Sequence, residues 1–165
     1  LPSLRYVAVT GTNGKTTTTA MIGRLLRALG HDAPDAGNIG TPLAGLALQA
    51  EPPAWAALEL SSFQLHDTPS VRPAVGVVTN LSPDHLDRYP SVDEYYADKA
   101  RLFANAGDDS TWVLNADDRE VMATRKPRTP VISSARDESV FAPSGVRPPI
   151  AGSTFVVSSS LSCSM

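Results

Sequence analysis

A short apolar run that leads into two glycines and a Lys-Thr pair sets the strongest constraint on how this chain can fold. Residues 7–9 are Val-Ala-Val, Gly11 and Gly14 follow, and Lys15 and Thr16 precede an apolar helical pattern. This order predicts a buried β-strand, a tight turn and a helix N-terminus. Glycines let the backbone N–H groups of such a turn point into one concavity, where the helix dipole adds positive potential. The stretch therefore predicts a phosphate-binding loop.

The loop departs from the usual P-loop spacing. The pattern G-x-x-x-x-G-K-[ST] would place a glycine where this chain has Val9. Lys15 can still reach the β- and γ-phosphates of a nucleotide, and the Thr16 hydroxyl can hold Mg²⁺. The alternative interpretation is an ordinary glycine turn that caps a helix. The strand before the loop and the amphipathic helix after it favour nucleotide binding.

Composition limits the class of protein and its partners. A chain of 165 residues, 42% of them hydrophobic, suits one domain with a sizeable core. A net charge of −3 gives no basic field, so we expect no nucleic-acid partner. The single cysteine, Cys163, excludes an internal disulfide and fits a reducing compartment. No apolar run reaches the roughly 18–20 residues that span a bilayer, so we expect no membrane partner.

Apolar runs of β-strand composition alternate with helical patterns along most of the chain. The expected strands cover residues 5–9, 54–60, 74–79, 111–114 and 131–133, and an edge strand covers residues 152–157. The expected helices cover residues 15–29, 42–49, 91–106 and 119–124, with a short helix or turn at residues 61–66. This alternation predicts an α/β fold with a mostly parallel sheet flanked by helices.

Two of these helices have a predicted apolar face. In the first helix, helical spacing relates Ile22, Leu25, Leu26 and Leu29. In the helix over residues 91–106, Ser91 and Glu94 have the spacing of a capping box. The face expected to pack inward there consists of Tyr95, Lys99, Leu102, Phe103 and Ala106.

Polar side chains follow several expected strands, at the sheet edge where ligands gather in parallel sheets. Residues 11–16, Glu59, residues 80–85 and residues 115–118 all have this position. Next to a P-loop, Glu59 is a candidate ligand for the Mg²⁺ of a nucleotide, directly or through water. A solvated carboxylate at a strand end is the alternative interpretation of Glu59.

Two further residues, His85 and Lys99, also have structural alternatives. His85 lies in a polar loop, where it could simply hydrogen bond to Asp84 or Asp87. Lys99 lies within a predicted helix, where it could be a surface lysine whose aliphatic stem lines the apolar face. The local sequence alone assigns neither residue a function.

Four motifs resemble the Mur ligase family. Residues 10–17, Thr-Gly-Thr-Asn-Gly-Lys-Thr-Thr, resemble its shortened P-loop. Residues 37–40, Gly-Asn-Ile-Gly, residues 58–65, Leu-Glu-Leu-Ser-Ser-Phe-Gln-Leu, and residues 84–90, Asp-His-Leu-Asp-Arg-Tyr-Pro, resemble the branch of the family that adds D-glutamate. The resemblance covers residues 5–120 in the correct order.

The resemblance implies a role for each matching residue, with ATP and Mg²⁺ as cofactors. It implies that the ATP phosphates are bound by Gly11, Thr12, Asn13, Gly14, Lys15, Thr16 and Thr17. Lys15 would contact the γ-phosphate, and Thr16 and Glu59 would hold the first Mg²⁺. His85 and Lys99, the latter as a carbamate, would serve a second Mg²⁺. The implied catalytic residues are thus Lys15, Glu59, His85 and Lys99, and the positions near the muramoyl substrate are Asn38, Ser61 and Gln64.

The activity implied by the resemblance is ATP-dependent ligation of D-glutamate to UDP-N-acetylmuramoyl-L-alanine, through an acyl-phosphate, by a monomeric cytoplasmic enzyme of peptidoglycan synthesis. Residues 1–141 would form the ATP-binding central domain, and residues 142–165 a divergent, poorly ordered tail that is rich in serine. Because the chain begins near the first strand of that domain, we expect a piece of a longer polypeptide without the family's other two domains. Two alternatives stay open: a nucleotide-binding fragment without ligase activity, and another amino-acid ligase of the same superfamily.

Overall fold

The computed structural model describes residues 4–107, 109–124, 131–132 and 154–157. Its strands are β1 (Arg5–Thr10), β2 (Asp35–Gly37), β3 (Trp55–Glu59), β4 (Val75–Val78), β5 (Thr111–Asn115), β6 (Val131–Ile132) and β7 (Thr154–Val157). Its helices are α1 (Lys15–Ala28), α2 (Leu43–Ala47), α3 (Ser62–Asp67), α4 (Val92–Ala100) and α5 (Arg119–Ala123), with a 3₁₀ helix at Arg101–Phe103. No helix in these ranges is long and apolar enough to cross a membrane.

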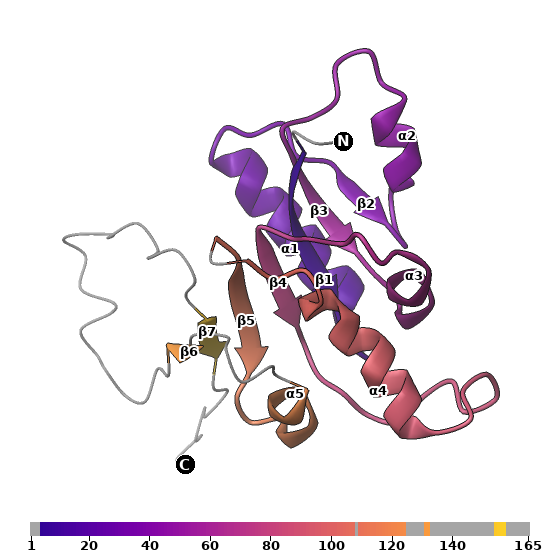
Figure 1. Cartoon of the computed structure of the whole chain (residues 1–165). Coiled ribbons are helices and arrows are strands. Elements are labelled where there is room, and N and C mark those ends of the chain that lie inside the picture. Colours follow the sequence, from indigo (N-terminus) through magenta and orange to yellow (C-terminus); the bar gives the residue numbers. More distant parts are fainter. Residues whose placement is uncertain (1–3, 108, 125–130, 133–153, 158–165) are drawn as a thin grey trace.

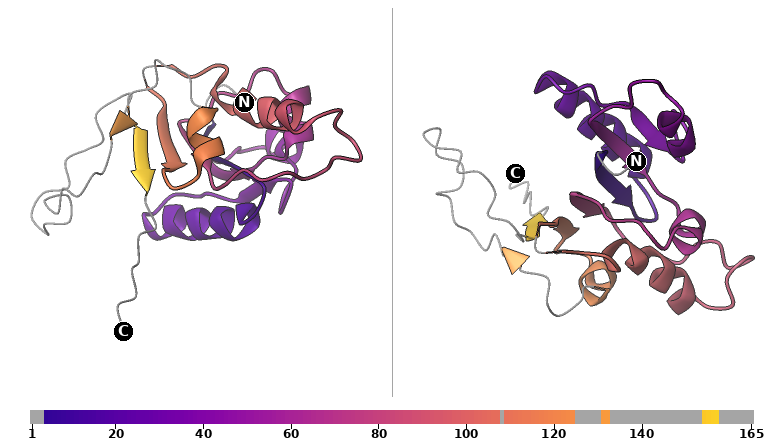
Figure 2. Two further views of the ribbon diagram at one scale, coloured as in Figure 1. Left: turned by 90° about the horizontal axis from the view of Figure 1, so that it is seen from below. Right: turned by 45° about the horizontal axis from the view of Figure 1, so that its top comes forward.

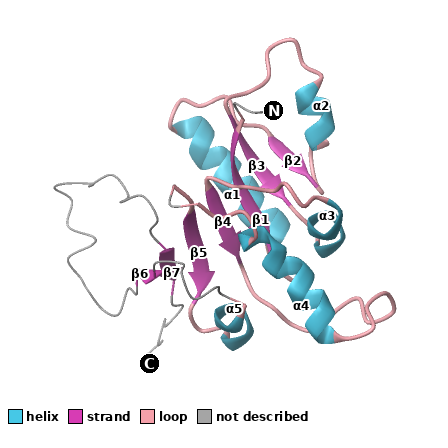
Figure 3. Ribbon diagram, viewed as in Figure 1, coloured by secondary structure: helices cyan, strands magenta, loops and turns pink. Residues whose placement is uncertain are grey.

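The described strands form one sheet in the order β2-β3-β1-β4-β5-β7-β6, and every neighbouring pair is parallel (Figure 1). Helix α1 lies on one face of the sheet, and α3, α4 and α5 lie on the other (Figures 2 and 3). Successive side chains of β1 point to opposite faces of the sheet. Val7 and Val9 pack toward α1, while Ala8 joins the larger apolar cluster on the opposite face. The predicted α/β class with a parallel sheet is confirmed.

Helix α1 buries only half of the face that its apolar spacing predicts, since Leu26 is buried and Ile22 packs against the same cluster. Leu25 and Leu29 are 60% and 66% exposed, whereas the buried positions are Thr19, Gly23 and Leu26. The reason is a close approach at Gly23, where a Cβ atom would overlap the Asp35 carboxylate. The helix therefore meets the sheet through Thr19, Gly23 and Leu26, and Leu25 and Leu29 lie outside this contact.

Helix α4 is shorter than its sequence predicts. It ends at Ala100, the 3₁₀ turn follows, and Ala106 is exposed, so the prediction of an inward-facing Ala106 is wrong. The other four residues of the predicted face are buried: Tyr95, Lys99, Leu102 and Phe103. The Ser91 hydroxyl does accept a hydrogen bond from the Glu94 backbone N–H, at 3.2 Å.

The strand at residues 154–157 is an inner strand and not the predicted edge strand. β7 pairs with β5 on one side and with β6 on the other, so β6 forms this edge of the described sheet. The sequence of β7, Thr-Phe-Val-Val, is β-branched and aromatic, which suits a strand paired on both sides. The serine-rich residues 158–165 lie outside the described residues.

Candidate nucleotide-binding site

The carboxyl ends of four parallel strands gather the predicted site segments. The loop at residues 11–14 follows β1, Glu59 ends β3, residues 79–85 follow β4, and residues 116–118 follow Asn115 at the end of β5. Asp118, in the last of these segments, is used by the fold. Its carboxylate accepts hydrogen bonds from the Leu81 backbone N–H at 2.8 Å and from two amides that begin α5.

Two glycines shape the loop after β1. Gly11 has a φ of 140°, and a Cβ atom there would overlap the Thr79 hydroxyl. Gly14 has a left-handed φ of 79° and is the N-cap of α1, without a side-chain hydrogen bond to the first helical turn. The N–H groups of that turn are therefore not capped by a side chain, an arrangement that suits an anion.

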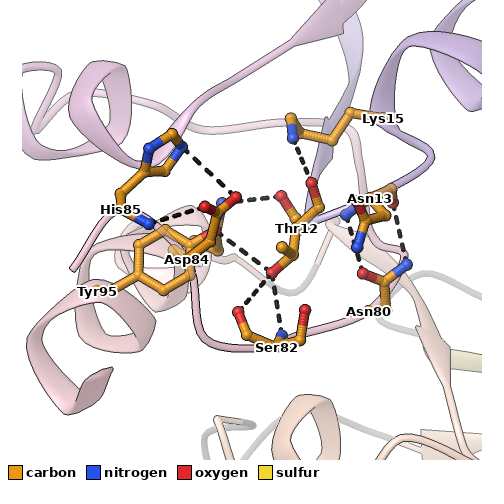
Figure 4. Close-up of polar contacts among 10 residues, drawn as sticks. Thr12, Asn13, Lys15, Asn80, Ser82, Asp84, His85 and Tyr95 are labelled. Carbon is orange, nitrogen blue, oxygen red and sulfur yellow. Dashed lines mark hydrogen bonds and ion pairs between the residues drawn. The ribbon is translucent and has the colours of Figure 1, made fainter. Parts of the chain in front are cut away.

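The loop after β4 holds the loop after β1 through a dense set of hydrogen bonds (Figure 4). The Thr12 backbone N–H donates to the Asn80 carbonyl at 2.9 Å, and the Asn13 N–H donates to Asn80 Oδ1 at 2.9 Å. Asn80 Nδ2 donates back to the Asn13 carbonyl at 3.0 Å. Thr12 Oγ1 donates to the Ser82 carbonyl and accepts from its N–H, both at 3.0 Å. The loop shape is therefore fixed by the fold itself.

Two lysines from distant parts of the chain reach this loop. Lys15 Nζ donates to the Thr12 carbonyl at 2.8 Å, and Lys99 Nζ donates to the Gly11 carbonyl at 2.8 Å. Lys99 is only 3% exposed. Burial and the nearby charge of Lys15 lower the pKa of Lys99 to about 7, although Asp84 opposes this change. The charge of Lys15 and the N–H donors of both lysines beside one glycine loop make a setting for an anionic group.

Thr16 and Thr17 are exposed on the first turn of α1. Both hydroxyls therefore stand in solvent beside the uncapped helix N-terminus. This position is consistent with contacts to phosphate or to a metal ion.

Glu59 is a buried carboxylate with one oxygen left over. The residue is 1% exposed, and its Oε1 accepts a hydrogen bond from Asn38 Nδ2 at 2.9 Å. Its Oε2 is also buried and has no hydrogen-bond partner. Asn38 in addition donates its backbone N–H to the Glu59 carbonyl at 2.9 Å. An unsatisfied, buried carboxylate oxygen is costly unless a cation pairs with it.

His85 contacts Asp84, one of the two partners that its structural interpretation names, and has an unusual backbone conformation. Its φ is 54°, and its backbone N–H donates to Asp84 Oδ1 at 2.8 Å. The ring Nε2 lies 3.7 Å from Asp84 Oδ2 (Figure 4). Its ring lies 5.4 Å from the ring of Phe63 and 5.9 Å from that of Tyr95, between centroids. The half-exposed imidazole thus packs beside Tyr95, whose ring also contacts Lys99 Nζ.

Ser61 and Gln64 form a complete capping box at the start of α3. Ser61 Oγ accepts from the Gln64 backbone N–H at 3.2 Å, and the Ser61 N–H donates to Gln64 Oε1 at 3.0 Å. The sequence signal for this box is Ser-x-x-Gln, which the sequence analysis did not use. Both side chains therefore have a structural role at the positions that the resemblance assigns to the substrate.

A cavity of about 400 Å³ lies between α3 and α4, and none of the predicted site residues lines it. Buried Asp98 forms part of its wall, with His66 Nδ1 at 3.0 Å and Arg101 Nε at 2.8 Å from its Oδ1. Burial alone would raise the pKa of Asp98, but the hydrogen bonds from His66 and Arg101 outweigh it and lower the pKa. This network joins α3 to α4, and the sequence analysis did not identify it.

Comparison with known proteins identifies a family for the chain. The Mur ligase middle domain matches residues 9–160. The UDP-N-acetylmuramoylalanine--D-glutamate ligase of Anaeromyxobacter dehalogenans is 48% identical over 148 residues, which is 84% of this chain and 32% of that protein. The protein of the same name from Pelotomaculum thermopropionicum is 50% identical over 112 residues, or 68% of this chain and 25% of its own length.

Solved structures show the same fold. A UDP-N-acetylmuramoyl-L-alanyl-D-glutamate--2,6-diaminopimelate ligase has a TM-score of 0.61 at 31% identity, over 73% of this chain and 28% of that one. The MurF ligase from Thermotoga maritima in complex with ADP has a TM-score of 0.59 at 21% identity, over 73% of this chain and 30% of that one. The chain spans about a quarter to a third of the length of the curated relatives it matches. On these matches, the chain belongs to the Mur ligase family and contains its middle domain.

Proposed function

We propose that this chain is the ATP-binding part of an enzyme that joins D-glutamate to UDP-N-acetylmuramoyl-L-alanine in peptidoglycan synthesis. The observation that carries the ATP-binding proposal is the convergence of Lys15 and Lys99 on the carbonyls of one glycine loop. The choice of D-glutamate rests on the names of the relatives at 48–50% identity. We further propose a monomer that works in the cytoplasm on small-molecule substrates and binds neither nucleic acid nor membrane.

In this proposal the nucleotide phosphates lie against the loop and the first turn of α1. The phosphate-binding residues are Gly11, Thr12, Asn13, Gly14, Lys15, Thr16 and Thr17. Lys15 leaves the Thr12 carbonyl to contact the γ-phosphate, and the uncapped N–H groups of α1 receive phosphate oxygens. The hydrogen bonds from residues 79–82 hold the loop ready for this contact.

The residues present fit a magnesium ion. Glu59 offers a buried oxygen without a partner, Thr16 offers an exposed hydroxyl, and both are the hard oxygen ligands that Mg²⁺ prefers. Within the described ranges no three His, Cys, Asp or Glu side chains cluster as a metal site, which agrees with an ion that keeps water and phosphate ligands. When bound, Mg²⁺ would neutralise charge on the phosphates.

Lys99 is suited to become the carbamate that the family resemblance implies. With a pKa of about 7, a large fraction of its amine is neutral at physiological pH. The neutral nitrogen can attack CO₂, forming an N–C bond and releasing one proton to solvent. The product carries carboxylate-like oxygens and, with nearby His85, would serve a second Mg²⁺.

The proposed reaction activates a carboxylate. An oxygen of the UDP-N-acetylmuramoyl-L-alanine carboxylate attacks the γ-phosphorus of ATP, and ADP leaves. The amine of D-glutamate then attacks the acyl-phosphate, phosphate leaves and the amine proton is lost. Lys15 and the loop amides stabilise the charge on the transferring group. Asn38 contributes by holding Glu59, and we propose that Ser61 and Gln64 keep the start of α3 in place beside the muramoyl substrate.

The test uses the complete polypeptide encoded around this chain, supplied with ATP, Mg²⁺, D-glutamate and UDP-N-acetylmuramoyl-L-alanine. We expect phosphate release that requires both substrates and that Lys15→Ala abolishes, while Arg24→Ala on the same helix has little effect. Release with another amino acid in place of D-glutamate would favour another ligase of the superfamily. Retained turnover in Lys15→Ala would contradict the role of the loop.

The 165-residue chain is assayed in parallel. We expect it to bind ATP without forming the amide, because the curated relatives are three to four times as long as the part it matches. Amide formation by the chain alone would contradict this expectation.

A further inference from the structure

Tyr95, on α4, contacts the glycine loop, Lys99 and His85 together. The residue is 1% exposed, and its hydroxyl lies 3.3 Å from Thr12 Oγ1. Lys99 Nζ lies 4.6 Å from the centre of its ring, and the His85 ring packs against it at 5.9 Å. None of the four sequence motifs contains Tyr95.

The hydrogen bonds around Thr12 fix the direction of the contact with Tyr95. Thr12 Oγ1 has one hydrogen, which it donates to the Ser82 carbonyl. Its two lone pairs remain, and the Ser82 N–H uses one of them. Tyr95 is therefore the donor to the other, and the Thr12 hydroxyl is fully satisfied. Removal of the Tyr95 hydroxyl would leave one of these positions empty next to the nucleotide loop.

The ring of Tyr95 acts on Lys99 from the same helix face. The two residues are four positions apart on α4, so their side chains are neighbours. The bulk of the ring beside Nζ limits the conformations of the flexible lysine stem, both for the free amine and for the carbamate. Tyr89 and Tyr96 pack on Tyr95 at 5.3 Å and 5.7 Å and hold the ring itself in place.

We propose that Tyr95 is a positioning residue that sets Lys99 and the phosphate-binding loop in one fixed relation. Its ring keeps Lys99 Nζ at the Gly11 carbonyl, and its hydroxyl anchors Thr12 in the same loop. The inference rests on the proposed function, because it takes the loop as the nucleotide site and Lys99 as the carbamate. It adds a residue that touches neither phosphate nor metal in that proposal.

The experiment compares variants of the complete polypeptide. Tyr95→Phe keeps the ring and removes the hydroxyl, whereas Tyr95→Leu removes both. Tyr6→Phe and Tyr6→Leu are matched controls near the start of β1, where the Tyr6 hydroxyl accepts a hydrogen bond from the Arg72 backbone N–H at 2.7 Å. Carbamate on Lys99 is measured by ¹³C NMR with labelled bicarbonate, ATP affinity by calorimetry, and folding by thermal melting. Tyr95→Phe should keep the wild-type carbamate signal and bind ATP about 3-fold more weakly. Tyr95→Leu should bind ATP still more weakly and show about 5-fold less carbamate signal, because the lysine stem is no longer confined beside the loop.

The outcomes separate the inference from the proposed function. If folded Tyr95→Leu matches Tyr6→Leu in both carbamate signal and ATP affinity, the inference is overturned. If wild type shows no carbamate, the proposed role of Lys99 fails, and ATP affinity decides the inference: an unchanged affinity in Tyr95→Phe overturns it, and a 3-fold loss supports it. If Tyr95→Leu does not fold, the same comparison of Tyr95→Phe with Tyr6→Phe decides.

Discussion

Glu59 shows at the scale of one side chain why a buried charge can indicate a ligand. The sequence places it at a strand end, where a solvated carboxylate is the simpler expectation, yet the structure buries it and satisfies only one oxygen. A chain that gains nothing from this charge would be more stable without it. We take the free oxygen as the mark of a cation site.

Glu59→Gln tests that interpretation. The substitution keeps the shape and an acceptor for Asn38 but removes the charge. We expect Mg²⁺ to increase the ATP affinity of the wild type, and this increase should be smaller in Glu59→Gln by about 10-fold or more. The free energy of unfolding should be unchanged or higher, since a buried charge is lost. Calorimetry with Mg²⁺ and with EDTA measures the first effect and urea denaturation the second. Glu51→Gln, at an exposed position, is the control. A Glu59→Gln variant with the Mg²⁺ dependence of the wild type would contradict a cation site at Glu59.

Lys99 gives a prediction for the pH dependence of stability. Burial and then the charge of Lys15 lower its pKa from 10.5 to about 7 in the folded chain. The unfolded chain therefore binds one more proton between pH 7 and pH 10.5, and the free energy of unfolding contributed by this group rises with pH across that window. One proton gives a slope of at most about 1.4 kcal/mol per pH unit.

Lys99→Met removes this group. In buffers purged of CO₂, urea denaturation should show that the free energy of unfolding of wild type rises from pH 7 to pH 9, and that the variant lacks this rise. Arg24→Met, on the exposed side of α1, removes a charge without removing the slope. Equal slopes in wild type and Lys99→Met would show that the buried amine does not titrate in this window.

At the scale of the elements, periodicity and capping signals located the segments better than their faces. The start of α1 and the N-cap of α4 are confirmed, but Leu25 and Leu29 are exposed because Gly23 decides how α1 meets the sheet. Strand β2, at residues 35–37, is three residues long, and the sequence does not predict it because so short a run has no usable alternation. Contacts between elements, absent from local patterns, determine these details.

The capping box of α3 gives a prediction at this scale. Ser61→Ala removes the acceptor for the Gln64 N–H and should lower the free energy of unfolding by about 1 kcal/mol, and Ser61→Thr should restore most of it. Urea denaturation of the chain measures both, with Ser70→Ala as an exposed control. If stability is unchanged in Ser61→Ala while the complete enzyme loses affinity for the muramoyl substrate, then the hydroxyl serves the substrate and not the helix.

At the scale of the whole molecule, parallel topology explains why the site could be predicted in part. Loops that follow β1, β3 and β4 meet at one sheet edge, so the sequence correctly groups residues 11–16, Glu59 and residues 80–85. The contact of Lys99 with Gly11 spans 88 positions and follows from the packing of α4, which no spacing encodes. The resemblance named Lys99, but only the fold brings it to the loop.

In the proposed function the glycine loop, and not the cavity between α3 and α4, binds the nucleotide. Hydrogen–deuterium exchange of the 165-residue chain with and without ATP and Mg²⁺ distinguishes the two sites. We predict slower exchange in the peptides that cover residues 11–18 and 79–85, and no change at residues 63–67, which line the cavity. Protection at residues 63–67 with none at residues 11–18 would contradict this placement of the nucleotide.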